Sequence, residues 1–248
     1  MRRLVWGLVL WGVALAGSLE AGGYLAPGGG TPTLALEERL GEVHLSLLAQ
    51  WPWLGVGLEG GLALGPLGYV GYGGRLEGGL GLGGLLHAEG GAGPVALSLR
   101  LGYRPLAHPP LFPEEGVFGR AAFRYREGPG VYSALLEKGE VSRLEGSYAL
   151  RREATYTLGA GLSTTGPYLL LGWKGEVGEG LDVLDLAFRL GGVNQVEARL
   201  FLTDLSLALT LAYPWRGSLS AWVGDLGVEA GYKGAPYLWV RYVWRWTE

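Results

Sequence analysis

The chain has 248 residues and a formal net charge of -3, so its charge gives no electrostatic basis for binding nucleic acid. It has no cysteine, which excludes disulfides, thiolate metal sites and a lipid-modified cysteine. Charged residues make up 17% of the chain, whereas it carries 47 Gly, 10 Trp and 13 Tyr. A charge-poor chain this rich in Trp and Tyr suggests rings placed at a membrane–water boundary.

Residues 1–16 have the three-part layout of a secretory signal peptide. Arg2 and Arg3 form a positive start, residues 4–15 are apolar, and Ala14-Leu15-Ala16 resembles a cleavage site. The apolar stretch is too short to span a bilayer of about 30 Å as a helix. We therefore expect a cleaved signal peptide over residues 1–16 and a single domain over residues 17–248. A retained anchor helix is the alternative.

From about residue 42 onward the chain repeats one sequence pattern, in which apolar residues alternate with small or polar ones and a tight turn follows. The alternation runs through residues 95–103, 154–163, 181–190, 193–202, 205–213 and 225–233. In the fifth of these segments, Leu207 and Leu209 share one face while Ser206 and Thr210 share the other. A period of two residues predicts β-strands.

The connections between these segments are short and rich in turn residues, as in Gly128-Pro129-Gly130, and links this short join antiparallel neighbours. One connection is longer, the Pro-rich stretch over residues 104–116. The alternation predicts about eleven strands after this stretch and about seven before it, although residues 53–88 blur into Gly-Leu runs. We expect about 16 strands in all, within a range of roughly 14 to 18.

Alternation alone fits both a soluble exported β-sandwich and a transmembrane barrel. Three features favour the barrel: the non-apolar face is mostly Gly, Ala and Ser, an export signal comes first, and each segment has the roughly 9–11 residues that a tilted strand needs to cross a bilayer. A closed sheet also satisfies every backbone group without water. The sequence therefore predicts an all-β fold, a single closed antiparallel transmembrane β-barrel with short turns on both sides.

The last strand gives the most specific resemblance. Leu238, Val240, Tyr242, Trp244 and Trp246 place apolar side chains at every second position before the end of the chain. In this respect the chain resembles bacterial outer-membrane β-barrel proteins, a resemblance that covers nearly all of residues 17–248. It departs from that class because Thr247 and Glu248 follow the last aromatic residue.

The resemblance implies an outer-membrane location in a bacterium, a lipid bilayer around the barrel, and recognition of the last strand by the barrel-assembly machinery. It also implies both termini on the periplasmic side and residues 104–116 outside the cell. The other external connections are short, which argues against an in-folded constriction loop. Whether the barrel forms a homo-oligomer is left open.

Parity along each strand assigns side chains to the two faces. We expect the following charged residues to face the lumen: Arg100, Arg120, Arg124, Arg126, Arg143, Glu145, Asp185, Arg189, Glu197, Arg199, Glu229, Arg241 and Arg245. We expect the following aromatic residues to face lipid: Tyr103, Tyr213, Tyr232, Tyr242, Trp244 and Trp246. Two hypotheses follow, a passive pore for small polar or anionic solutes and a structural barrel whose charges pair without conductance.

An enzyme is the hypothesis from another class. His44, His87 and His108 are dispersed, without metal-ligand spacing, and no G-x-S-x-G nucleophile motif is present. The Gly-rich residues 68–84 lack the ending of a phosphate-binding loop. We expect no catalytic residue, no metal and no cofactor. Separately, the single Met and single Asn follow a thermophile trend, so we expect a source that grows at high temperature.

Overall fold

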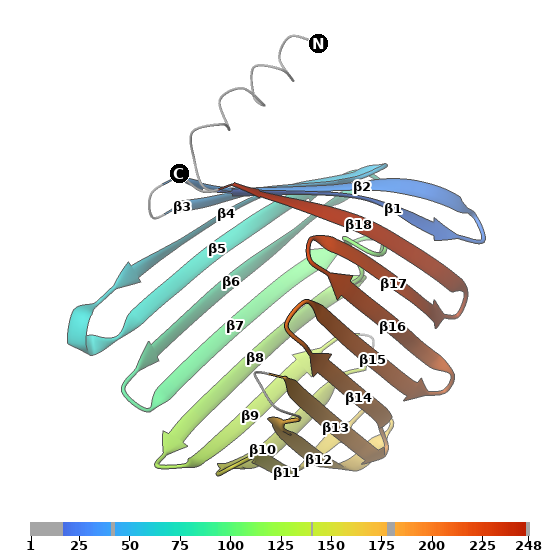
Figure 1. Ribbon diagram of the computed structural model, residues 1–248. Coiled ribbons are helices and arrows are strands. Elements are labelled where there is room, and N and C mark those ends of the chain that lie inside the picture. The colour runs from blue at the N-terminus through green and yellow to red at the C-terminus, as the bar shows by residue number, and fades with distance from the viewer. Residues whose placement is uncertain (1–16, 41–42, 140, 178–181, 247–248) are drawn as a thin grey trace.

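The computed structural model describes residues 17–40, 43–139, 141–177 and 182–246, and within them the regular structure is almost entirely β-strand (Figure 1). In chain order these are β1 (Gly17–Ala26), β2 (Gly29–Leu40), β3 (Val43–Gln50), β4 (Trp53–Ala63), β5 (Tyr69–Gly78), β6 (Leu82–Ala92), β7 (Val95–Arg104), β8 (Gly116–Glu127), β9 (Gly130–Lys138), β10 (Arg143–Arg151), β11 (Thr155–Ser163), β12 (Gly166–Glu176), β13 (Val183–Gly191), β14 (Asn194–Phe201), β15 (Leu205–Tyr213), β16 (Arg216–Val223), β17 (Leu226–Lys233) and β18 (Pro236–Trp246). A short 3₁₀ helix, η2 (Gly65–Leu67), lies between β4 and β5. Among the described residues, no helix has the length and apolar character needed to cross a bilayer. The signal peptide predicted over residues 1–16 lies outside them.

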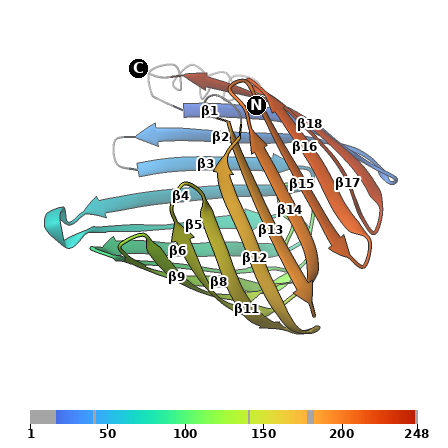
Figure 2. The same cartoon turned by 60° about the horizontal axis from the view of Figure 1, so that its bottom comes forward.

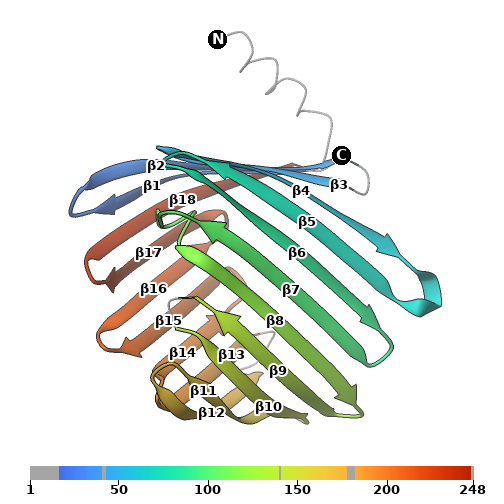
Figure 3. The ribbon, with the colours of Figure 1, turned by 180° about the vertical axis from the view of Figure 1, so that it is seen from behind.

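The strands form one closed sheet. Each pairs antiparallel with the next along the chain, and β1 pairs with β18 from Gly17 opposite Trp246 to Leu25 opposite Leu238. Figure 2 shows the sheet curving round an interior, with β2–β6 in one wall and β12–β16 in another, and Figure 3 shows β4–β9 side by side from behind. The predicted closed antiparallel barrel is confirmed.

The part of the chain that the structure describes contains 18 strands, the upper end of the predicted range. The uncertainty came from residues 53–88, where β4, β5 and the start of β6 are regular strands. A glycine has no side chain to mark a face, so alternation is hard to see where Gly occupies one parity. Backbone pairing, by contrast, does not depend on the side chain.

Cross-strand partners share a face, so the pairing separates an inward and an outward set round the whole barrel. Leucines such as Leu97, Leu99 and Leu101 fall on the outward face and are about half exposed. Within the described strands, the charged residues of outward parity are Glu38, Glu127 and Lys138, each close to the end of its strand. The outward wall is therefore apolar over its middle.

Outward aromatic rings gather near the two ends of the barrel. The end that holds the termini carries Tyr72, Tyr125, Tyr132, Tyr148, Tyr156, Trp173, Tyr242, Trp244 and Trp246. The opposite end carries Tyr103, Tyr213 and Tyr232, and turn residues Trp51 and Trp215 are exposed there too. The aromatic residues predicted to face lipid are therefore on the outer surface, three at each end.

Many inward glycines make room for an aromatic ring on the neighbouring strand. Gly161 lies opposite Tyr168, Gly227 opposite Trp222, and Gly231 opposite Tyr237. A Cβ at Gly161 would lie 2.5 Å from the ring of Tyr168, one at Gly227 would lie 2.8 Å from the indole, and one at Gly231 would lie 2.6 Å from the tyrosine hydroxyl. Bulky rings therefore lie flat across bare backbone, and glycine on the inner face is a packing requirement.

Candidate functional site

The candidate site is the inward face of the barrel. All the charged residues predicted to face the lumen have inward parity: Arg100, Arg120, Arg124, Arg126, Arg143, Glu145, Asp185, Arg189, Glu197, Arg199, Glu229, Arg241 and Arg245. They differ in whether a group of opposite charge lies nearby. A paired charge is largely neutralised, whereas an unpaired charge can interact with a solute in the lumen.

Several of these residues form cross-strand pairs. Arg189 donates to Glu145 at 3.0 Å and to Glu197 at 2.9 Å, and the hydroxyl of Tyr168 donates to Glu145 at 3.0 Å. A longer cross-strand pair joins Asp185 to Lys174 at 4.0 Å, and Arg199 lies 3.6 Å from Glu197 on its own strand, β14. This part of the inner wall is largely neutralised.

The two arginines of the last strand have different surroundings. The guanidinium of Arg241 lies between two indoles, 3.8 Å from the centroid of Trp239 and 4.5 Å from that of Trp222, with Glu20 at 3.6 Å. Arg245 pairs with Asp225 near the end of the barrel and is more than half exposed. Arg241 is thus part of a packed aromatic cluster, which Glu229 extends by accepting a hydrogen bond from Tyr237 at 2.8 Å.

A column of arginines on β8 remains without partners. The side chains of Arg120, Arg124 and Arg126 make no hydrogen bond or ion pair within the described residues, and all three residues are exposed. The strand rise of about 3.3 Å per residue spreads them over roughly 20 Å of the inner wall. Arg120 lies toward the end opposite the termini, and Arg126 lies toward the end that holds them.

A fully buried ion cluster lies near the end opposite the termini. Arg104 is 0% exposed and binds Glu77 through two hydrogen bonds, of 2.7 and 2.9 Å. Arg75 also donates to Glu77 at 2.7 Å, and Arg104 donates to the carbonyl and carboxylate of Glu114 at 2.8 and 3.1 Å. Sequence reasoning assigned Arg104 to a loop and missed this cluster, although the parity of Arg100 extends to residue 104.

The long connection between β7 and β8 folds against the inner wall of the barrel. Phe112 is fully buried, its ring 5.9 Å from that of Trp53 and 5.3 Å from the guanidinium of Arg104. The side chain of Gln50 donates to the carbonyl of Pro109 at 2.5 Å and accepts from the amide of Leu111 at 3.1 Å.

The expectation that no loop folds inward was therefore wrong. The short lengths of the other connections said nothing about this one. The pocket of Phe112 is built by strands far away in the sequence, so local reading could not reveal it.

Because consecutive strands are antiparallel, this connection lies at the end opposite the termini, which we call the mouth. A cavity of about 570 Å³ opens there, lined by β7, β8, the turns after β9, β11, β13 and β15, and Glu114 of the connection. A second cavity of about 770 Å³ lies between the connection and the turns after β15 and β17. Both cavities include Glu114, Gly139, Pro214 and Arg216, so they are neighbours at the mouth.

The histidines do not assemble a catalytic or metal site within the described residues. His87 lies 4.0 Å from Glu59 on the inner wall, and the ring of His108 contacts the carbonyl of Trp51 at 2.9 Å. No group of three metal-ligating side chains occurs among these residues.

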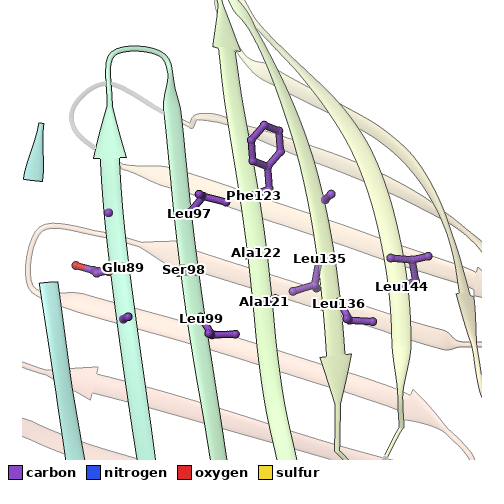
Figure 4. Close-up of a pocket in the computed structure, with 13 residues that line it drawn as sticks. Glu89, Leu97, Ser98, Leu99, Ala121, Ala122, Phe123, Leu135, Leu136 and Leu144 are labelled. Atoms are coloured by element: carbon purple, nitrogen blue, oxygen red, sulfur yellow. The ribbon is translucent and has the colours of Figure 1, made fainter. Parts of the chain in front are cut away.

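A further hollow, of about 540 Å³, lies on the outer wall (Figure 4). Leu97, Leu99, Phe123, Leu136 and Leu144 surround small residues such as Ala121 there. It forms because small outward side chains on β6–β10 leave a groove between leucines. Its lining is apolar, and it is not part of the interior.

The architecture places the chain among closed antiparallel β-barrels with an apolar outside and a charged inside. A solved triple mutant of the Rhodopseudomonas blastica porin has the same fold, with a TM-score of 0.50 and 8% sequence identity, over 93% of this chain and 99% of that one. A second triple mutant of that porin aligns over the same shares with a TM-score of 0.49 and 8% identity. Comparison of the sequence with known protein families and with curated proteins gives no match. At this identity the likeness shows the fold.

Proposed function

We propose that the protein is a bacterial outer-membrane barrel that acts as a passive pore for small polar or anionic solutes. The observation that carries the proposal is the accessible charge on the inward face. Arg199 and Lys174 are 56% and 55% exposed although they point into the barrel. Exposed charges inside a closed sheet are in contact with water, and a wet interior is what a pore requires.

The size of the barrel supports this function. For 18 strands, spaced about 4.8 Å apart and tilted about 40°, a circular cross-section has a backbone radius of about 18 Å. Barrels of this size commonly leave an aqueous channel once side chains are added. The unpaired arginines of β8 would bias such a channel toward anions.

The outer surface supports insertion in a membrane. Its apolar middle, flanked by aromatic rings at both ends, matches the pattern of transmembrane barrels. In that setting the termini lie on the periplasmic side, the mouth faces outward, and residues 1–16 act as a cleaved export signal. The last strand, β18, would present its outward aromatic residues to the barrel-assembly machinery.

A structural barrel without conductance is the second candidate. It is favoured by the paired charges around Arg189 and by the β7–β8 connection, which is fixed across part of the mouth by Phe112 and Gln50. If the connection and the side chains together close the path, the charges serve only to hold the wall.

Planar-bilayer recording of the refolded barrel separates the two candidates. Stepwise conductance is expected for a pore, and its absence from a correctly folded preparation would sink the proposal. In a conducting barrel, Arg120→Glu combined with Arg124→Glu should lower anion preference, because two exposed positive charges become negative. The matched control is Arg120→Lys with Arg124→Lys, which retains both charges. Reversal potentials in a salt gradient measure the preference, and equal values for the two double variants would rule out this column as the filter.

A further inference from the structure

One register row at the mouth brings positive charges together. Arg100 on β7 lies directly opposite Arg120 on β8, and that row continues through Glu137 on β9 to Arg143 on β10. Like charges directly opposite each other on neighbouring strands are destabilising. An arrangement that keeps them needs a negative group nearby.

The nearest carboxylates are already engaged. Glu114 accepts from Arg100 at 3.0 Å and from Arg104 at 3.1 Å, while Glu137 accepts from Arg143 at 2.6 Å. Arg120 has no partner within the described residues. The Nε atom of Arg100 is buried without a hydrogen-bond acceptor, an unsatisfied state that buried donors rarely show. The row therefore has both an excess of positive charge and an unused donor.

This row opens on the cavity of about 570 Å³ at the mouth. The cavity is also lined by Gln195 and Thr165, which carry polar groups, and by Val141 and Pro214, which are apolar. The volume is within the range of small-molecule sites, roughly 300–1,000 Å³, and is far larger than an inorganic anion needs. The cavity thus has a charged side for an anionic group and room for an uncharged body.

We propose that the mouth cavity binds an organic oxyanion with two negative charges, of the sugar phosphate type, before it passes to the β8 column. Arginine suits this role because its planar donors match the oxygens of a phosphate group. Arg120 and Arg100 would hold the phosphate, and the remaining cavity would take the hydroxyl-bearing body. Passage to the column rests on the proposed pore, whereas binding at the mouth does not.

Isothermal titration calorimetry on the refolded full-length barrel in zwitterionic detergent tests the proposal, with glucose 6-phosphate as probe and glucose as the uncharged control. A soluble probe in phosphate-free micelles excludes a lipid headgroup as the source of the heat. Arg120→Gln should weaken binding of glucose 6-phosphate at least about fivefold, the effect of losing roughly 1 kcal/mol of binding free energy. Arg151→Gln is the matched control, because it removes an exposed inward arginine from the far end of β10, outside both the cavity lining and the β8 column. The affinity of this control variant for glucose 6-phosphate should stay within about twofold of that of the unmodified barrel.

Three results would overturn the proposal: no binding of glucose 6-phosphate, equal weakening by Arg120→Gln and Arg151→Gln, or glucose binding as tightly as its phosphate. Arg120→Lys, which preserves the charge, should retain part of the affinity if the first variant folds poorly. Conductance is measured separately. A conducting barrel that does not bind the probe overturns this inference alone, and a binding barrel that does not conduct overturns only the pore.

Discussion

Arg104 shows how the barrel wall accommodates a charge that water does not reach. Its guanidinium is satisfied by Glu77, by Glu114 and by a backbone carbonyl, so every strong interaction it makes is local to the mouth. A buried ion pair of this kind is not necessarily a net gain in stability, since desolvation opposes the attraction. Removing one member of the pair is destabilising, because the other charge then stays buried without compensation.

Arg104→Met should lower the free energy of unfolding by about 3–5 kcal/mol, because Glu77 keeps a buried charge with a single remaining partner. Lys174→Met is the matched control. Its ion pair with Asp185 is long, at 4.0 Å, and its own side chain is 55% exposed, so a change below about 0.5 kcal/mol is expected. Urea titration of the barrel refolded in lipid vesicles measures both. If both variants lost a similar amount of unfolding free energy, burial of the Arg104 ion pair would not be the cause of its larger expected effect.

Among the elements, the strands are shaped by the pairing of inward glycines with rings on the next strand. Gly102 on β7 lies opposite Phe118 on β8, and a Cβ there would meet the phenyl ring and the backbone of Gly84. Phe118 is only 3% exposed, so its ring has little room to move away. The same relation recurs on other strand pairs, as with Gly161 and Tyr168 or Gly231 and Tyr237.

Gly102→Ala should therefore destabilise the barrel by about 1–3 kcal/mol through overpacking. Gly146→Ala is the matched control, since the outward face of β10 has nothing within 4 Å of the added Cβ. That variant should be neutral or slightly stabilising because alanine loses less backbone entropy on folding. Chemical denaturation compares the two, and equal effects would show that space on the inner face is not limiting.

The strands themselves could be predicted well from sequence where side chains alternate. The segment over residues 205–213 is β15, and residues 95–103 fall within β7, because leucines at every second position mark one face. The charged inner face followed from the same parity. Three features required tertiary contacts: the regularity of β4–β6, the burial of Arg104, and the inward fold of the β7–β8 connection. The first depends on backbone pairing between adjacent strands, and the other two depend on neighbours distant in sequence, as Phe112 depends on Trp53.

At the scale of the whole molecule, the polarity is reversed relative to a water-soluble protein. Charges and buried rings lie inside, while exposed leucines cover the outside between two bands of aromatic residues. Adjacent residues of one strand therefore meet opposite environments, and identical substitutions at such positions should have unequal effects.

Leu99→Arg on the outer wall of β7 should cost about 2–4 kcal/mol in a lipid bilayer, the range measured for arginine near the midplane of transmembrane barrels. Ser98→Arg is the neighbouring control; its side chain points inward, opposite Glu89, so little loss is expected. The difference in destabilisation between the two variants should be smaller when water, and not lipid, surrounds the outer wall. Folding equilibria in vesicles give the two values, and a Ser98→Arg variant that is the more destabilised would reverse the assignment of faces.

The pairing of β1 with β18 has a consequence for chain entropy. Every other strand contact joins neighbours in sequence, but this one closes a loop that contains almost the whole described chain. The entropic cost of closing such a loop rises only slowly with the length of the loop. The contacts of one strand pair, β1 with β18, must nevertheless offset all of that cost. Side chains there span very long separations: Trp239 donates to Thr33 across 206 residues, Arg241 pairs with Glu20, and the rings of Tyr24 and Tyr237 stack at 5.6 Å. The aromatic and charged cluster on the last strand thus stabilises the closure of the barrel. Without this closure, the curved sheet would have two strand edges with unpaired backbone groups.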